Sequence, residues 1–129
     1  MEIRVYYEDT DAGGVVYHSN YLKYFERGRT EFFRDRGISV SELARDGYIF
    51  PVVHVELDYR APALHDDLLS VETEVLEVGK SSFTLGQQVL RVVDGKVLAD
   101  GRVKLACVGP GMKVKRLPEE LAQVLDEQS

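Results

Sequence analysis

Residues 6–21 read YYEDTDAGGVVYHSNY, and this stretch decides how the rest of the chain is interpreted. It places two carboxylates, Asp9 and Asp11, shortly before the adjacent glycines Gly13 and Gly14. Glycine adopts backbone conformations that other residues resist, so the pair predicts a tight polar loop that presents the carboxylates.

A helix is expected to begin just after this loop. Ser19 and Asn20 are favoured N-cap residues, and apolar residues then recur with helical spacing from about 20 to 36. The first turn of a helix carries unpaired N–H groups and a partial positive charge. The sequence therefore predicts a site where a helix start polarises a carbonyl group while the Asp11 carboxylate attacks it or activates water.

The buried face of this helix contains a glycine. Tyr21, Phe25, Gly28 and Phe32 are spaced by three or four residues and form an apolar stripe. Glycine inside a helix costs about 1 kcal/mol relative to alanine. We therefore expect Gly28 to allow the close approach of a sheet that wraps around the helix.

After a short helix at 40–45, which a capping box introduces, the sequence changes to the alternating pattern of β-strands. Asp94-Gly95 is typical of a two-residue hairpin loop of type I′. Pro118 at a first helical position predicts a short terminal helix. The predicted strands cover residues 2–8, 49–61, 68–78, 82–93 and 96–108.

These elements describe an α+β fold, a single domain over residues 1–129 with an antiparallel sheet of about five strands around one long central helix. One helix covers only one face of such a sheet. We expect Leu90, Val92 and Leu98 on the other face to make further contacts. Because edge strands also need protection, the pattern favours a homo-oligomer.

The composition indicates a folded protein without a nucleic-acid partner. The chain is 44% hydrophobic, and its formal net charge of -6 excludes a global basic field. Residues 1–4 do not resemble a signal peptide, and no apolar run approaches the roughly 18 residues of a membrane span. Cys107 is the only cysteine, so no intrachain disulfide forms and a cytoplasmic location is expected.

The motif D-x-D-x-x-G-x-V-Y-H-x-x-Y, residues 9–21, resembles that of a known family. Residues 6–34 are similar to the opening of the hotdog-fold acyl-CoA thioesterases, in the YbgC-like branch of the 4-hydroxybenzoyl-CoA thioesterase family. Residues 58–63 look like that family's second strand and following loop, and residues 79–83 look like its strand-turn-strand.

The resemblance implies a hotdog fold and hydrolysis of an acyl-CoA to a carboxylic acid and CoA, without a cofactor. Asp11 matches the catalytic carboxylate, and the carbonyl is polarised near His18, whose side chain is a second catalytic candidate. The family's active sites lie between subunits, which implies a homodimer or homotetramer, and its YbgC-like branch implies a membrane-associated protein partner. The implied substrate-binding residues are Gly14, Val16, Tyr17, Tyr21, Arg60, Lys80, Ser81 and Ser82, with Arg60 and Lys80 as candidates for the CoA phosphates.

Most of these residues also have a structural interpretation. Asp9 and Asp11 are both able to satisfy turn amides, and we expect that role for Asp9. The imidazole of His18 has either a structural role or a catalytic role. Tyr17 and Tyr21 fill either an acyl pocket or the core.

Other polar residues are expected to be structural. Glu26 and Glu31 lie off the apolar stripe, and we expect them to pair with Arg29 and Arg27. The three histidines lack metal-ligand spacing, so no metal site is predicted. Cys107 is expected to be a small core residue.

Two other functions are compatible with the sequence. Hotdog hydratases and dehydratases also use a histidine and a carboxylate near the central helix, although their motifs differ from residues 9–21. A non-catalytic acyl-binding or scaffold subunit is the second alternative.

Overall fold

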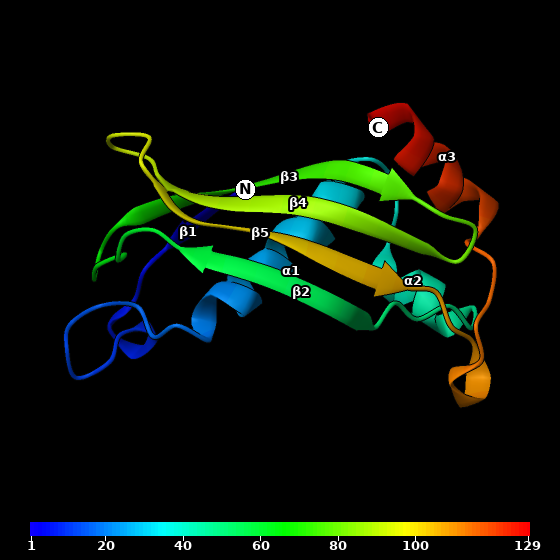
Figure 1. The fold of residues 1–129 in the computed structure, drawn as a ribbon, viewed down its shortest axis with the longest axis horizontal. Coiled ribbons are helices and arrows are strands. Elements are labelled where there is room, and N and C mark those ends of the chain that lie inside the picture. Colours follow the sequence, from blue (N-terminus) through cyan, green and yellow to red (C-terminus); the bar gives the residue numbers. More distant parts are fainter.

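The computed structural model describes residues 1–129 and contains an antiparallel sheet wrapped around one helix (Figure 1). The strand order is β1-β3-β4-β5-β2, and every neighbouring pair is antiparallel. This confirms the expected α+β architecture. The strands are β1 (Glu2–Arg4), β2 (Val52–Tyr59), β3 (Leu68–Val78), β4 (Ser82–Arg91) and β5 (Val97–Ala106).

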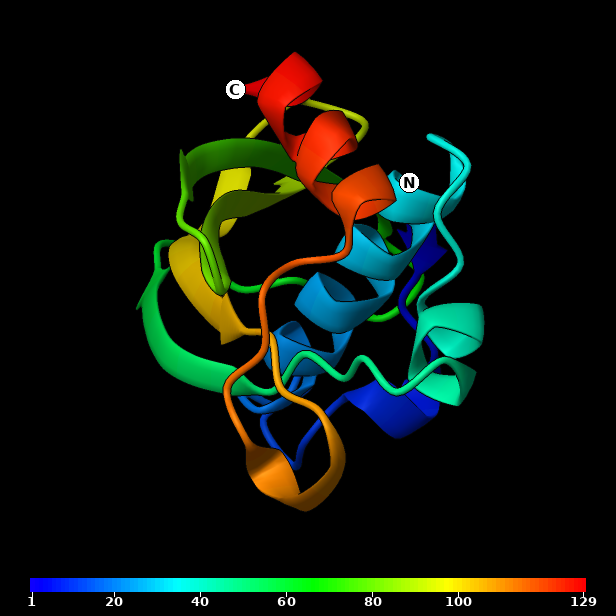
Figure 2. The ribbon, with the colours of Figure 1, turned by 90° about the vertical axis from the view of Figure 1, so that its right-hand side faces the viewer.

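Helix α1 (Asn20–Arg34) lies at the centre, with the sheet curled along one side of it (Figure 2). Helix α2 (Val40–Arg45) lies on the other side, and α3 (Glu119–Gln128) packs near the end of β3. All four residues of the predicted stripe on α1 are buried, so the face assigned to the core is confirmed.

Two glycines bring the helix and the sheet together. A Cβ atom on Gly28 would lie 2.3 Å from Cγ1 of Val71 in β3, a distance that real side chains do not reach. On β5, a Cβ atom on Gly101 would lie 2.2 Å from the Glu56 carbonyl oxygen of β2 and 3.1 Å from the ring of Phe25 on α1. The close approach predicted at Gly28 is confirmed, and Gly101 provides a second one.

The first predicted strand, residues 2–8, is too long. β1 ends at Arg4, because Val5 exchanges backbone hydrogen bonds with the loop at Asp66 and Asp67 instead of with a strand. The chain then forms a 3₁₀ turn at Tyr7–Asp9.

The predicted two-residue hairpin at Asp94-Gly95 is wrong. β4 ends at Arg91 and β5 begins at Val97, so the loop has five residues, and Gly95 adopts a φ of 69° within it. The Asp94 carboxylate accepts hydrogen bonds from the backbone N–H of Lys96 and from the Arg91 guanidinium, which closes this wider loop.

The placement of Leu98 on the outer face is also wrong. The β4–β5 register shifts at this point, which leaves Leu98 without a partner on β4, and its side chain is fully buried in the core. Smaller differences occur at element ends. α1 stops at Arg34, two residues early, and Pro118 is the N-cap of α3, not its first residue.

The two edges of the sheet differ in length and character. β1 has only three residues, whereas β2 has eight and leaves one side without a strand partner. Four apolar side chains of β2 are 40–56% exposed: Val52, Val53, Val55 and Tyr59. None of the helices is both long enough and apolar enough to cross a membrane.

Candidate active site

The loop that carries Asp11 folds back on itself as a narrow hairpin. Thr10 and Val16 form an antiparallel bridge, and the Asp11 N–H donates to the Val15 carbonyl at 2.9 Å. Gly14, at the tip, has a φ of 80° and donates its N–H to the Asp11 carbonyl. The predicted tight turn is therefore present. Gly14 has a conformational role in it, because it supplies the positive φ at the tip.

One oxygen of the Asp11 carboxylate is held and the other is free. Oδ1 accepts a hydrogen bond from the Gly13 N–H at 2.8 Å, which is the turn role expected as the structural alternative. Oδ2 has no hydrogen-bond partner within the chain, and the residue is exposed. Because one oxygen of the carboxylate holds the turn, the other oxygen remains free to act as a nucleophile or as a general base.

Asp9 ties this loop to the start of α1. Its carbonyl accepts from the Tyr17 N–H and from the Asn20 side-chain amide, both at 2.9 Å, and its carboxylate accepts from the Tyr6 N–H. The hydroxyl of Tyr24 is buried nearby, and its pKa is raised by burial and by the Asp9 carboxylate. These contacts agree with the turn role expected for Asp9.

The start of α1 is not capped by a side chain, contrary to expectation. Ser19 occupies the N-cap position in a helical conformation and makes no capping hydrogen bond, while the side chain of Asn20 turns to Asp9. The backbone N–H groups of His18 and Ser19 form no hydrogen bond within the chain. They are therefore available to a carbonyl oxygen at the positive end of the helix.

The His18 side chain lies on the surface in an aromatic setting. Its ring is 4.3 Å from the Tyr17 ring and 6.4 Å from that of Tyr59, centre to centre. Tyr59 also donates its hydroxyl to the His18 carbonyl at 3.0 Å. The motif did not identify Tyr59, whose strand is 41 residues away in sequence.

Two residues predicted to bind substrate belong to the core. Val16 is 4% exposed and Tyr21 is 3% exposed. The Tyr21 hydroxyl accepts a hydrogen bond from the Ala63 N–H, and its ring contacts Tyr24 and Tyr59. Their positions indicate packing behind the site instead of direct contact with substrate.

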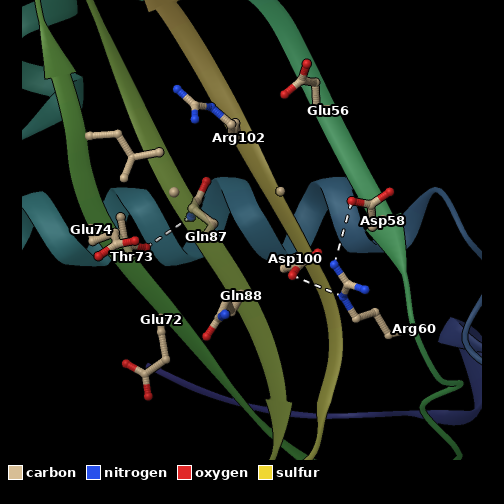
Figure 3. Close-up of a pocket in the computed structure, with 13 residues that line it drawn as sticks. Glu56, Asp58, Arg60, Glu72, Thr73, Glu74, Gln87, Gln88, Asp100 and Arg102 are labelled. Carbon is tan, nitrogen blue, oxygen red and sulfur yellow. Dashed lines mark hydrogen bonds and ion pairs between the residues drawn. The ribbon is translucent and has the colours of Figure 1, made fainter.

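Arg60 lies on the outer face of the sheet, where its charge is already paired (Figure 3). Nε donates to the Asp100 carboxylate at 3.1 Å, and Asp58 lies 3.9 Å from the guanidinium. The hydrogen bond to Asp100 raises the pKa of Arg60.

The surrounding hollow, of about 670 Å³, is unfavourable for CoA phosphates. Its polar lining has five carboxylates and two guanidiniums, so an anion meets net repulsion. The carboxylates are Glu56, Asp58, Glu72, Glu74 and Asp100, and the guanidiniums are Arg60 and Arg102.

The other predicted contacts, Lys80, Ser81 and Ser82, lie at the opposite end of the molecule. Tyr59 pairs with Ala99 at one end of the sheet, beside the start of α1, and Val52 pairs with Leu105 at the other. We call these the Asp11 end and the Lys80 end. β2 alone separates them by about 23 Å, so one chain does not bring all predicted site residues together.

Cys107 and the possible metal-ligating side chains do not form a further site. Cys107 is fully buried, and burial raises the pKa of its thiol, which disfavours the nucleophilic thiolate. No three side chains of His, Cys, Asp or Glu converge in a geometry that could hold a metal ion.

Comparison with known proteins identifies the family. The model of a family described as the thioesterase-like superfamily matches residues 5–125. The acyl-CoA thioesterase YbgC of Haemophilus influenzae is 45% identical over 92% of this chain and 88% of that protein. The chain belongs to the thioesterase-like superfamily.

Solved structures of this superfamily share the fold. A hypothetical protein of Thermus thermophilus, TT1821, superposes with a TM-score of 0.93 at 32% identity, covering 100% of this chain and 98% of that one. BH1999, a gentisyl-coenzyme A thioesterase, gives 0.88 at 29% identity over 95% and 98%. The expected hotdog fold and the class of enzyme, a thioester hydrolase, are confirmed.

Proposed function

We propose that this thioesterase hydrolyses acyl-CoA to a carboxylic acid and CoA, with Asp11 as its catalytic carboxylate. One observation carries the proposal: the unbonded N–H groups of His18 and Ser19 stand beside a loop whose carboxylate keeps one oxygen free. Relatives named as acyl-CoA thioesterases support the choice of substrate.

The free N–H groups donate to the thioester oxygen and stabilise the charge that develops on it. In a nucleophilic route, Asp11 Oδ2 bonds to the carbonyl carbon, the C–S bond breaks, and CoA leaves as a thiolate; water then hydrolyses the mixed anhydride. In a general-base route, Asp11 takes a proton from water, whose oxygen bonds to the carbon as the C–S bond breaks. In either route, this proposal assigns the His18 side chain as the group that protonates the departing thiolate.

The complete active site, in this proposal, lies between two copies of the chain. Asp11 is exposed on its loop, and β2 offers an unpaired edge with exposed apolar side chains. Unpaired edges of this kind invite pairing with another strand. A two-fold dimer that pairs β2 with its copy satisfies the edge and buries these side chains.

Antiparallel pairing places the start of one β2 beside the end of the other. The Lys80 end of one subunit is then adjacent to the Asp11 end of its partner. In such a dimer, Lys80, Ser81 and Ser82 of one subunit lie near the Asp11 loop of the other subunit. Such a dimer accounts for the separation of these residues within one chain.

The test is the variant Asp11→Asn, because asparagine retains an oxygen for the Gly13 N–H and preserves the turn. Thiol release from a panel of acyl-CoAs should fall by a factor of about 100 or more. Circular dichroism and CoA binding should be unchanged. Asp46→Asn, at an exposed residue after α2, is the matched control and should keep wild-type turnover.

Unchanged turnover in Asp11→Asn would overturn the site assignment. A wild-type protein that hydrolyses no acyl-CoA, yet binds acyl chains or a partner protein, would favour the non-catalytic alternative.

The proposed setting is the cytoplasm, since the single cysteine is buried as a free thiol and no disulfide is formed. A membrane-associated protein partner, implied by the resemblance, is part of the same proposal and is tested by affinity capture with the intact protein.

A further inference from the structure

A small apolar pocket opens at the Lys80 end, between the second half of α1, α2 and the residues that lead into β2. Its volume is about 170 Å³, and 11 of its 14 lining residues are hydrophobic. Pockets for drug-sized ligands measure about 300–1,000 Å³, so this one accommodates only a short acyl group. Its walls include Phe33, Ile38, Leu43, Tyr48, Phe50 and Phe83.

Three polar residues of α1 also line this pocket: Glu26, Arg29 and Thr30. The expected close pairing of Glu26 with Arg29 is not formed, because no carboxylate lies within 4.0 Å of the Arg29 guanidinium, which also makes no hydrogen bond. The Glu26 charge acts on Arg29 only at longer range, where it raises the pKa of Arg29 against the larger, opposite effect of burial. Glu31 pairs with Arg34 instead of Arg27.

The partly buried guanidinium of Arg29 has no hydrogen-bond acceptor within the chain. The guanidinium has five N–H donors and no acceptor, and a half-buried charge without an acceptor is unfavourable. Burial lowers the pKa of Arg29 because the charged form is withdrawn from water. Four arginines reach a carboxylate within the chain, namely Arg34, Arg60, Arg91 and Arg102, and Arg29 is among those that do not.

In the proposed dimer, the pocket that contains Arg29 lies close to the Asp11 loop of the partner subunit. Ile49 and Phe50, on its rim, directly precede β2, so the proposed two-fold pairing sets this pocket beside the partner's catalytic loop. An acyl group attached to a thioester at that loop then extends toward Arg29. This step rests on the proposed function and its dimer.

We infer that the pocket receives the acyl group of a thioester held by the partner's Asp11, and that Arg29 binds a terminal carboxylate on that group. The substrate class is a short ω-carboxyacyl thioester, the half-thioester of a dicarboxylic acid. A carboxylate matches the planar donor array of a guanidinium and would accept the hydrogen bonds that Arg29 does not make within the chain. Glu26, exposed at the rim, repels such a ligand and moderates its affinity.

The first test compares matched thioesters: glutaryl-CoA with pentanoyl-CoA, and succinyl-CoA with butyryl-CoA. Arg29→Met should lower kcat/KM for the carboxylated member of each pair at least tenfold and leave the neutral member within threefold. Arg29→Lys should recover part of the loss. Arg27→Met, the same change at an exposed position of α1, is the control, and Glu26→Gln should raise kcat/KM for glutaryl-CoA.

The second test asks which subunit supplies Arg29. Asp11→Asn and Arg29→Met homodimers are mixed and allowed to exchange subunits. In a mixed dimer, one site combines wild-type Asp11 with wild-type Arg29 and the other site has neither. Random exchange makes half of the dimers mixed, so glutaryl-CoA hydrolysis should recover to about a quarter of the wild-type rate.

Three results would overturn the inference: a wild-type preference for the neutral thioesters, an equal effect of Arg29→Met on both members of a pair, or no recovery on mixing. Dissociation of the Arg29→Met dimer would assign Arg29 to the subunit contact instead. If neutral thioesters are hydrolysed in an Asp11-dependent manner while these results are obtained, the proposed function stands and only the substrate class fails.

Discussion

Single atoms set the distance between helix and sheet in this protein. Gly28 has no Cβ, and Val71 of β3 occupies the space that a Cβ would need. At Gly101, the closest approach is by β2: a Cβ atom would lie 2.2 Å from the Glu56 carbonyl oxygen and 3.1 Å from the Phe25 ring. Gly28 therefore limits how closely α1 and β3 pack, whereas Gly101 chiefly allows the approach of β2 to β5.

Gly28→Ala should therefore destabilise the fold, although alanine is the better helix former. Overpacking costs about 1–3 kcal/mol and exceeds the gain of about 1 kcal/mol in helix propensity, because Val71 is branched and buried. Urea unfolding should show a lower midpoint with an unchanged slope. Combining the change with Val71→Ala should restore part of the stability, and strictly additive effects would contradict the close approach.

At the scale of elements, the Asp11 loop and the first turn of α1 form one unit. The Asp9 carbonyl binds both Tyr17 and the side chain of Asn20, and Asp11 stands two residues further along. The backbone N–H groups of His18 and Ser19 form no hydrogen bond within the chain, and in the proposed mechanism they donate to the thioester oxygen.

Removing the tether should affect catalysis more than folding. Asn20→Ala deletes one hydrogen bond worth about 0.5–1.5 kcal/mol, which loosens the Asp11 loop relative to the helix start. We expect kcat/KM to fall about tenfold with a loss of stability below about 1 kcal/mol. Ser19→Ala, which removes no capping bond, is the control; an equal effect from it would contradict the tether's role.

At the scale of the whole molecule, the two sheet edges have opposite properties. β1 is a three-residue edge, whereas β2 leaves eight residues and four exposed apolar side chains without cover. The residues implied in substrate binding are also divided between the two ends of the chain. The proposed dimer through β2 would account for both features.

Val55→Arg should dissociate this dimer, since it places a charge on the apolar edge. Light scattering should give twice the chain mass of 14.6 kDa for the wild type and the mass of one chain for the variant. Thioesterase activity should fall in parallel. Val93→Arg, at an 86% exposed loop position, is the control and should remain dimeric. A monomeric wild type with full activity would contradict the two-subunit site.

The sequence by itself determined the features that depend on neighbouring residues. The Asp/Gly loop, the buried stripe of α1, the limits of α2 and β3, and the close approach at Gly28 follow from spacing and backbone preference within short segments. These signals also carry the resemblance to the hotdog thioesterases, which the comparisons confirm at the level of the family.

Only the tertiary structure decided which side chains meet. Val5 bonds to a loop some 60 residues away, Leu98 turns inward at a register shift, and Arg29 finds no carboxylate. The separation of Asp11 from Lys80 likewise depends on strand pairing. Such outcomes are set by contacts between distant segments, whose free energy overrides local preference and leaves no periodic trace in the sequence.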